Sequence, residues 1–134
     1  MSSVKLNKMI EKLQLVNLVP EVSTDEIEIS SPEINRPALQ LAGYFEHFAS
    51  ERVQIIGYVE YTYLKSLDRD VKLANYEQFL SSDIPCVIYS TRTEPDEDMI
   101  ELAKKYHKPL LSSHRITSDL MAEVIRWLGV ELAP

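Results

Sequence analysis

The sequence predicts a three-layer α/β/α domain whose central sheet is mostly parallel. Short apolar runs rich in β-branched residues recur at Val53-Gln54-Ile55-Ile56 and Cys86-Val87-Ile88-Tyr89, as buried parallel strands require. Segments with apolar residues at helical spacing lie between and after these runs. Strands that alternate with helices pair in parallel through right-handed crossovers, and helices then cover both faces of the sheet.

Length and composition describe one ordinary globular domain. The chain has 134 residues, of which 45% are hydrophobic and 26% charged, close to the average for soluble domains. No interior linker, repeat or low-complexity tract divides it, so residues 1–134 are expected to form a single domain. The one cysteine, Cys86, excludes a disulfide scaffold and indicates a reducing compartment.

Charge and hydropathy narrow the expected partners and location. The 14 basic and 21 acidic residues leave a formal charge of −7, and the basic residues form no stripe, so no nucleic-acid partner is expected. The N-terminus lacks the apolar run of a signal peptide, and no apolar run is long enough to cross a membrane. The sequence therefore predicts a cytoplasmic protein without a membrane partner.

The first third of the chain is expected to hold two short helices and a strand. Ser2-Ser3 suits the N-cap of a first helix that ends near Gln14. The apolar residues of this helix follow helical spacing: Leu6, Met9, Ile10 and Leu13. Ile27-Glu28-Ile29 alternates like a half-buried strand. The second helix is expected to begin at Pro37 and to end at Gly43.

The middle of the chain is expected to be mainly helical outside its two buried strands. The strand at residues 53–56 is followed by predicted helices over 58–67 and 71–80. After the strand at residues 86–89, Pro95 starts a helix with every local signal, namely acids in its first turn, an apolar face and lysines near its end.

A short strand and a long helix are expected to complete the domain. Pro109-Leu110-Leu111 predicts the strand, and Thr117 or Ser118 is expected to cap the helix, which ends at Gly129. An apolar stripe along this helix predicts its buried face: Leu120, Met121, Val124, Ile125 and Leu128.

Motifs for catalysis or metal binding are not found. A phosphate-binding loop needs closely spaced glycines followed by Lys-Ser or Lys-Thr, whereas Gly43, Gly57 and Gly129 are isolated and none precedes a lysine. The three histidines and Cys86 show no metal-ligand spacing. We therefore expect no catalytic residue, no metal site and no cofactor in this chain, and we interpret Cys86 as a buried core thiol.

One segment suggests a ligand site. Asn35 and Arg36 precede a predicted helix N-terminus, where an arginine fork and free backbone N–H groups favour a phosphate or carboxylate. Arg52 is a further candidate for holding the anion, and Tyr44 for lining the pocket. The alternative interpretation is that Asn35 caps the helix, Arg36 pairs with a surface acid and the aromatic residues belong to the core.

The segment from Asn35-Arg36-Pro37 through Gly43-Tyr44-Phe45, continued by residues 51–57, closely resembles the N-terminal domain of bacterial HPr kinase/phosphorylase. The resemblance extends along nearly the whole chain, and Leu132-Ala133-Pro134 resembles the point where that domain meets the catalytic one. The chain departs from the family at Ala38, where members often carry Gly, and at Thr93, where a Thr-Arg-Gly turn is common.

The resemblance implies a noncatalytic regulatory and assembly domain from a cytoplasmic, bifunctional enzyme. That enzyme uses ATP to phosphorylate a serine of the phosphocarrier protein HPr and removes the phosphate by phosphorolysis, which controls carbon-source use. In the family, the ATP- and Mg²⁺-binding residues belong to a C-terminal kinase domain, the natural partner of this chain, and the whole protein is a homohexamer.

Two other functions stay open. The family's N-terminal domain is similar to the UDP-binding N-terminal domains of muramyl-peptide ligases, so a sensor for a sugar phosphate or nucleotide is the main alternative. A stand-alone domain that docks on a separate protein would suit the acidic surface, and an exposed apolar patch would be its sign.

Overall fold

The computed structural model describes residues 2–134, and its main sheet has five strands in the order β2-β7-β6-β5-β4. The four parallel strands are β4 (Ile34–Asn35), β5 (Val53–Ile56), β6 (Val87–Tyr89) and β7 (Leu110–Ser112). The edge strand β2 (Val16–Asn17) pairs antiparallel with β7. A separate two-stranded sheet joins β1 (Val4–Lys5) and β3 (Glu28–Ile29).

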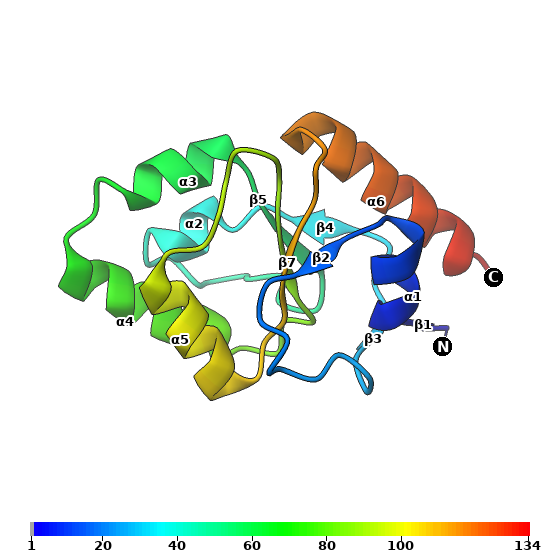
Figure 1. The fold of residues 1–134 in the computed structure, drawn as a ribbon, viewed down its shortest axis with the longest axis horizontal. Helices are drawn as coiled ribbons and strands as arrows, with labels where there is room; N and C mark the ends of the chain where they lie inside the picture. Colours follow the sequence, from blue (N-terminus) through cyan, green and yellow to red (C-terminus); the bar gives the residue numbers. More distant parts are fainter. Residues whose placement is uncertain (1) are drawn as a thin grey trace.

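Helices cover both faces of the main sheet, which confirms the predicted three-layer α/β/α architecture (Figure 1). The helices α1 (Leu6–Lys12) and α6 (Thr117–Glu131) pack on one face. On the other face lie α2 (Ala38–Leu41), α3 (Tyr58–Leu64), α4 (Arg69–Leu80) and α5 (Glu97–Tyr106). The connections from β4 to β7 all run through this second helical layer, as right-handed crossovers between adjacent parallel strands do.

The sheet separates two hydrophobic cores, and its central strands contribute to both. Ile55 and Ile88 pack with α1 and α6, whereas Ile56 and Val87 pack with the four helices opposite. Successive strand residues point to opposite faces, so every residue of β5 and β6 is buried. This double burial explains why both strands are rich in β-branched apolar residues, with Gln54 of β5 as a buried polar exception.

Helix α5 follows its sequence signals closely. Asp96 is the N-cap, and its carboxylate accepts a hydrogen bond from the Met99 backbone N–H at 2.8 Å. The helix ends at a left-handed residue, His107, with φ of 57°. The helix therefore begins two residues after Pro95, where the sequence placed its start, whereas the first-turn acids Glu97 and Asp98 and the late lysines Lys104 and Lys105 lie where predicted.

Several predicted helix ends are wrong. Ser2-Ser3 does not cap α1, because Lys5 is the N-cap residue and Ser3 instead donates to Glu28 across the small sheet. Helix α6 has Ile116 as its N-cap residue, so neither predicted hydroxyl serves, and it continues through Gly129 to Glu131. Leu132 packs against the core just beyond this helix and Glu131 pairs with Lys8, so the chain has contacts past Gly129 that offset the weak stop signal of one glycine.

Other differences concern short or edge elements. The two-residue strands β1, β2 and β4 were not predicted, since so short a run carries no periodic signal. Ile125, expected on the buried stripe of α6, is 45% exposed. Within residues 2–134, no helix has both the length and the apolar character needed to span a bilayer.

Candidate functional site

The carboxyl ends of the four parallel strands meet at one edge of the sheet, and two cavities open there. One measures about 410 Å³ and is lined partly by Arg36, Tyr58 and Met121. The other measures about 520 Å³ and is lined partly by Thr91 and Arg92. Both share three lining residues, Tyr58, Ile116 and Thr117. Open α/β sheets commonly bind ligands at this edge, which makes it the candidate functional site.

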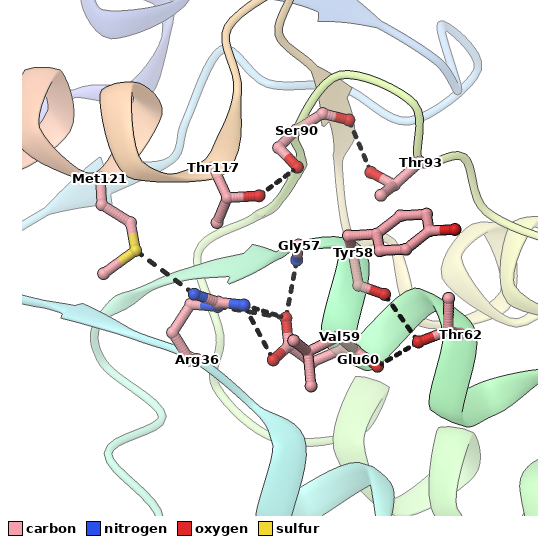
Figure 2. A network of polar contacts seen from close by, with 10 residues as sticks. All are labelled: Arg36, Gly57, Tyr58, Val59, Glu60, Thr62, Ser90, Thr93, Thr117 and Met121. Carbon is pink, nitrogen blue, oxygen red and sulfur yellow. Dashed lines mark hydrogen bonds and ion pairs between the residues drawn. The ribbon is translucent and has the colours of Figure 1, made fainter.

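Arg36 directly follows β4 and points across this edge toward α3 (Figure 2). Its Nη2 donates to both carboxylate oxygens of Glu60, at 2.6 and 2.9 Å, and its Nε donates to Oε1 at 3.1 Å. The Arg36 side chain is 28% exposed, whereas that of Glu60 is only 4% exposed. A bidentate contact with a buried carboxylate fixes the guanidinium plane. Arg36 therefore forms a rigid part of the cavity wall.

Glu60 also organises the turn from β5 into α3. Its Oε1 accepts a hydrogen bond from the Gly57 backbone N–H at 2.7 Å, which caps the start of α3. No side chain fits at Gly57, because a Cβ there would lie 2.7 Å from both Arg36 Nη2 and Thr117. A third residue, Met121, accepts a contact from Arg36 Nη1 through its sulfur at 3.3 Å. The ion pair therefore ties β4, α3 and α6 together.

Asn35 faces away from the cavities and into the sheet layer. Its side-chain amide donates to the Oε1 atoms of Gln40, at 3.2 Å, and Gln54, at 2.7 Å. Asn35 does not cap α2, because Pro37 is the N-cap residue and no side chain caps that helix. The alternative interpretation from the sequence is therefore correct in pairing Arg36 with an acid, but wrong in making Asn35 the cap and in placing the acid on the surface.

Arg52 and Tyr44 lie apart from the cavities at Arg36. Arg52 precedes β5, at the opposite end of the strand, where its Nη2 contacts Glu33 at 2.7 Å. Tyr44 follows α2, is 48% exposed and contacts Glu46 through its hydroxyl at 3.5 Å. Neither residue lines the two cavities. Phe45 and Phe48, which follow Tyr44 in the sequence, are by contrast partly buried against the core, and the Phe48 ring lies 5.8 Å from that of Phe79 on α4.

The loop after β6 supplies functional candidates that were not singled out from the sequence. Arg92 has φ of 67°, in the left-handed region, and its guanidinium has no ion-pair or hydrogen-bond partner within residues 2–134. The loop is braced by Thr93, which donates to the Ser90 carbonyl at 2.6 Å, and by a 2.7 Å bond between the Ser90 and Thr117 hydroxyls. The sequence did hold a signal for Arg92, because it lies in the loop after a predicted parallel strand, and such loops converge at one edge of the sheet.

Helix α6 begins at this same edge, beside Arg92. Its N-cap, Ile116, offers no side-chain acceptor, so the first backbone N–H groups of α6 have no side-chain cap. The Ile116 side chain is exposed, as are those of Tyr58 and Val59. Within residues 2–134, the edge thus combines the unpaired guanidinium of Arg92, a helix N-terminus and apolar walls.

Burial suppresses ionisation of two titratable groups, Cys86 and Tyr89, in the folded chain. Complete burial raises the pKa of the Cys86 thiol to about 12, which confirms the interpretation of Cys86 as a core thiol. Burial likewise raises the pKa of Tyr89 above its ordinary value. Among residues 2–134, no cluster of three histidine, cysteine or acidic side chains is placed to hold a metal ion.

Comparison with known proteins decides the family. The family model described as HPr Serine kinase N terminus matches residues 4–128. This chain belongs to that family. The match covers every element of the main sheet and all the residues that build the edge described above.

Curated relatives place this N-terminal domain within longer proteins. It is 44% identical over 134 residues to the HPr kinase/phosphorylase of Lachnoclostridium phytofermentans, covering 100% of this chain and 43% of the relative. For the HPr kinase/phosphorylase of Alkaliphilus metalliredigens, the identity is 39% with the same coverage. For that of Caldicellulosiruptor bescii, it is 40%, covering 96% of this chain and 42% of the relative. The chain thus spans less than half the length of these relatives and matches their N-terminal domain.

A solved structure has a similar fold. The regulatory region of Clostridium perfringens pyrophosphatase, comprising CBS and DRTGG domains and complexed with the activator diadenosine tetraphosphate, matches with a TM-score of 0.54. The sequences are 16% identical, and the match covers 97% of this chain and 47% of the other. At that identity the likeness concerns the fold of this N-terminal domain alone.

Proposed function

We propose that this chain is the noncatalytic regulatory and assembly domain of a bifunctional HPr kinase/phosphorylase. The complete enzyme would transfer phosphate from ATP to a serine of HPr and remove it by phosphorolysis, and would thereby control carbon-source use. The observation that carries the proposal is the 44% identity over the whole chain to the N-terminal domain of an HPr kinase/phosphorylase.

The chemistry is assigned to the part of the enzyme outside this chain. The sequence has isolated glycines and no phosphate-binding loop, so ATP and Mg²⁺ would bind in the C-terminal kinase domain. That domain would be the direct partner of this chain, HPr would be the substrate, and the complete protein would be a cytoplasmic homohexamer. Residues 1–134 would contribute contacts or an effector response.

The test compares the complete enzyme with the 134-residue chain. Each is incubated with HPr, ATP and Mg²⁺, and phosphoserine on HPr is quantified by mass spectrometry; a reaction without ATP is the control. Phosphoserine is expected with the complete enzyme and only at background with residues 1–134. Phosphorylation by the short chain at a comparable rate would refute the noncatalytic role, and failure of the complete enzyme would refute the kinase assignment.

A second candidate function, a sensor for a sugar phosphate or nucleotide, is favoured by the cavities at the carboxyl edge. Arg36 faces a concave, partly apolar cavity of about 410 Å³, a volume suited to a small ligand. Because Glu60 holds the Arg36 guanidinium, the cation free to take an anion at this edge is Arg92.

Calorimetric titration tests the sensor function. Sugar phosphates and uridine nucleotides are titrated into the wild-type chain, into Arg92→Gln and into the control Arg69→Gln, which removes an exposed arginine paired with Asp98 on α5. Binding that Arg92→Gln abolishes and Arg69→Gln preserves would support a sensor at this edge. Absence of heat and of any thermal shift with all ligands would refute it.

A further inference from the structure

A third cavity lies in the helical layer formed by α1 and α6. It opens between the C-terminal end of α1 and the C-terminal half of α6. It measures about 420 Å³, within the range of small-molecule sites. Its wall contains three cationic residues, two acidic residues and one tryptophan: Lys12, Arg115, Arg126, Glu123, Glu131 and Trp127. The cavity shares no lining residue with those at the carboxyl edge of the sheet.

The charges in this wall do not cancel. Glu123 is already paired with Arg126 at 2.6 Å, and Glu131 is paired with Lys8 at 2.6 Å. Lys12 and Arg115 have no acidic partner within 4.0 Å anywhere in residues 2–134. A chain of net charge −7 thus keeps two uncompensated cations in the wall of one cavity, and such a pair attracts an anion.

Arg115 is held in place without losing its capacity to donate. Its Nη1 donates to the Leu13 carbonyl at the end of α1, at 2.6 Å, and the Arg115 backbone N–H donates to Ser113 Oγ at 3.1 Å. Its Nε and Nη2 have no protein acceptor within the described residues and are not sealed from solvent. A guanidinium that is fixed on one side and free on the other can grip two oxygens of a phosphate.

Trp127 provides the apolar part of the wall. It is the one tryptophan of the chain, and it is partly buried against the core between α1, α6 and the sheet. An indole ring anchored in this way offers a planar surface for an aromatic ligand at small conformational cost. A ligand that matches both features carries a flat ring at one end and a phosphate at the other.

We propose that this cavity binds a nucleoside monophosphate, with the base against Trp127 and the phosphate on Arg115 and Lys12. The site is independent of the kinase activity proposed above, because it needs no residue outside this chain. It adds a nucleotide-responsive surface to the face formed by α1 and α6. Nonspecific binding of a nucleic-acid strand is disfavoured by the acidic character of the rest of the chain.

The test uses the 134-residue chain and the fluorescence of Trp127. AMP is titrated beside ribose 5-phosphate, which lacks the ring, and adenosine, which lacks the phosphate. Saturable quenching is expected with AMP, with each fragment binding at least about tenfold more weakly because it makes only one of the two contacts. Failure of AMP to change the fluorescence, or adenosine binding as tightly as AMP, would overturn the proposal.

Variants locate the site. Lys12→Gln removes one cation whose side chain makes no hydrogen bond or ion pair within residues 2–134, so it leaves the fold undisturbed. This substitution is expected to lower the affinity for AMP about tenfold, as loss of a charge-assisted hydrogen bond does. Arg115→Gln should lower the affinity for AMP at least as much, whereas the control Arg69→Gln should leave that affinity unchanged. Unaltered AMP affinity in Lys12→Gln and Arg115→Gln, with unfolding midpoints near that of the wild type, would exclude this cavity.

Discussion

Glu60 is the one charged residue that is fully buried among residues 2–134, and its carboxylate is satisfied entirely by Arg36 and by the Gly57 backbone. A buried charge is tolerated only when its partners replace the lost hydration. The arginine that suggested a ligand anchor in the sequence therefore has a structural task first. Any ligand at the 410 Å³ cavity would contact an arginine that is already fixed.

We predict that Glu60→Gln lowers the free energy of unfolding by about 3 kcal/mol, because it leaves a partly buried arginine without its counter-charge. The measurement is urea denaturation of both proteins. The matched control is Glu33→Gln, which removes the exposed partner of Arg52 and should cost less than about 1 kcal/mol. Equal losses in the two variants would show that burial of the first pair is unimportant.

Cys86 illustrates how burial changes reactivity. With its pKa raised to about 12, about one thiol in ten thousand is ionised at pH 8. We predict that iodoacetamide does not label Cys86 in the native chain between pH 7 and 9 but labels it promptly in guanidinium. Ser81→Cys, at an exposed position at the end of α4, provides the positive control. Native labelling of Cys86 at the rate of the added cysteine would contradict the burial.

At the scale of elements, two glycines that look alike in the sequence have opposite roles. Gly57 lies where β5 meets α3, and a Cβ there would lie 2.7 Å from Arg36 and Thr117. Gly129 lies inside α6, where a Cβ would contact nothing within 4 Å. The first is required by close packing at the carboxyl edge, and the second only weakens its helix.

We therefore predict opposite effects of the same substitution. Gly129→Ala should raise the free energy of unfolding by about 1 kcal/mol, because alanine is the better helix former. Gly57→Ala should lower it by about 1–3 kcal/mol, since the added methyl group displaces the ion pair and Thr117. Thermal and urea unfolding of both variants provide the measurement. A stabilising Gly57→Ala would mean that this edge is loosely packed.

At the scale of the whole molecule, a single sheet supports both hydrophobic cores. Because Ile55 and Ile56 are neighbours in β5 but face different cores, neither helical layer can detach without exposing strands that the other layer also covers. Such sharing couples the two cores, so the domain should unfold as one cooperative unit.

We predict that Trp127 fluorescence, which reports the layer of α1 and α6, and far-UV circular dichroism, which reports all helices, give the same urea midpoint. Leu128→Ala and Leu80→Ala remove the same side chain from a buried position, one in each of the two cores. Each should destabilise the chain by about 3–5 kcal/mol and should shift both probes together. Separate midpoints in either variant would show that the layers unfold independently.

Local signals explain which parts of the fold were predictable. Helix α5 was predicted to within two residues of its start, because its first-turn acids, apolar face and late lysines are signals carried by the helix itself. The strands β5 and β6 were predicted for a similar reason, since burial on both faces makes their residues mostly apolar and β-branched. The ends of α6 were not, because its N-cap residue carries no capping side chain and its last residues make contacts with distant parts of the chain, such as Glu131 with Lys8.

The sequence by itself determined the fold class, the two central strands, the helices with strong local signals and the family to which the chain belongs. Only the tertiary structure decided that Arg36 pairs with Glu60, 24 positions away, and that Arg52 lies at the opposite end of β5. It also decided that Lys12, Arg115 and Trp127 meet at one cavity. The physical reason is that helix and strand signals act over a few neighbouring residues, whereas sites arise where distant segments pack together.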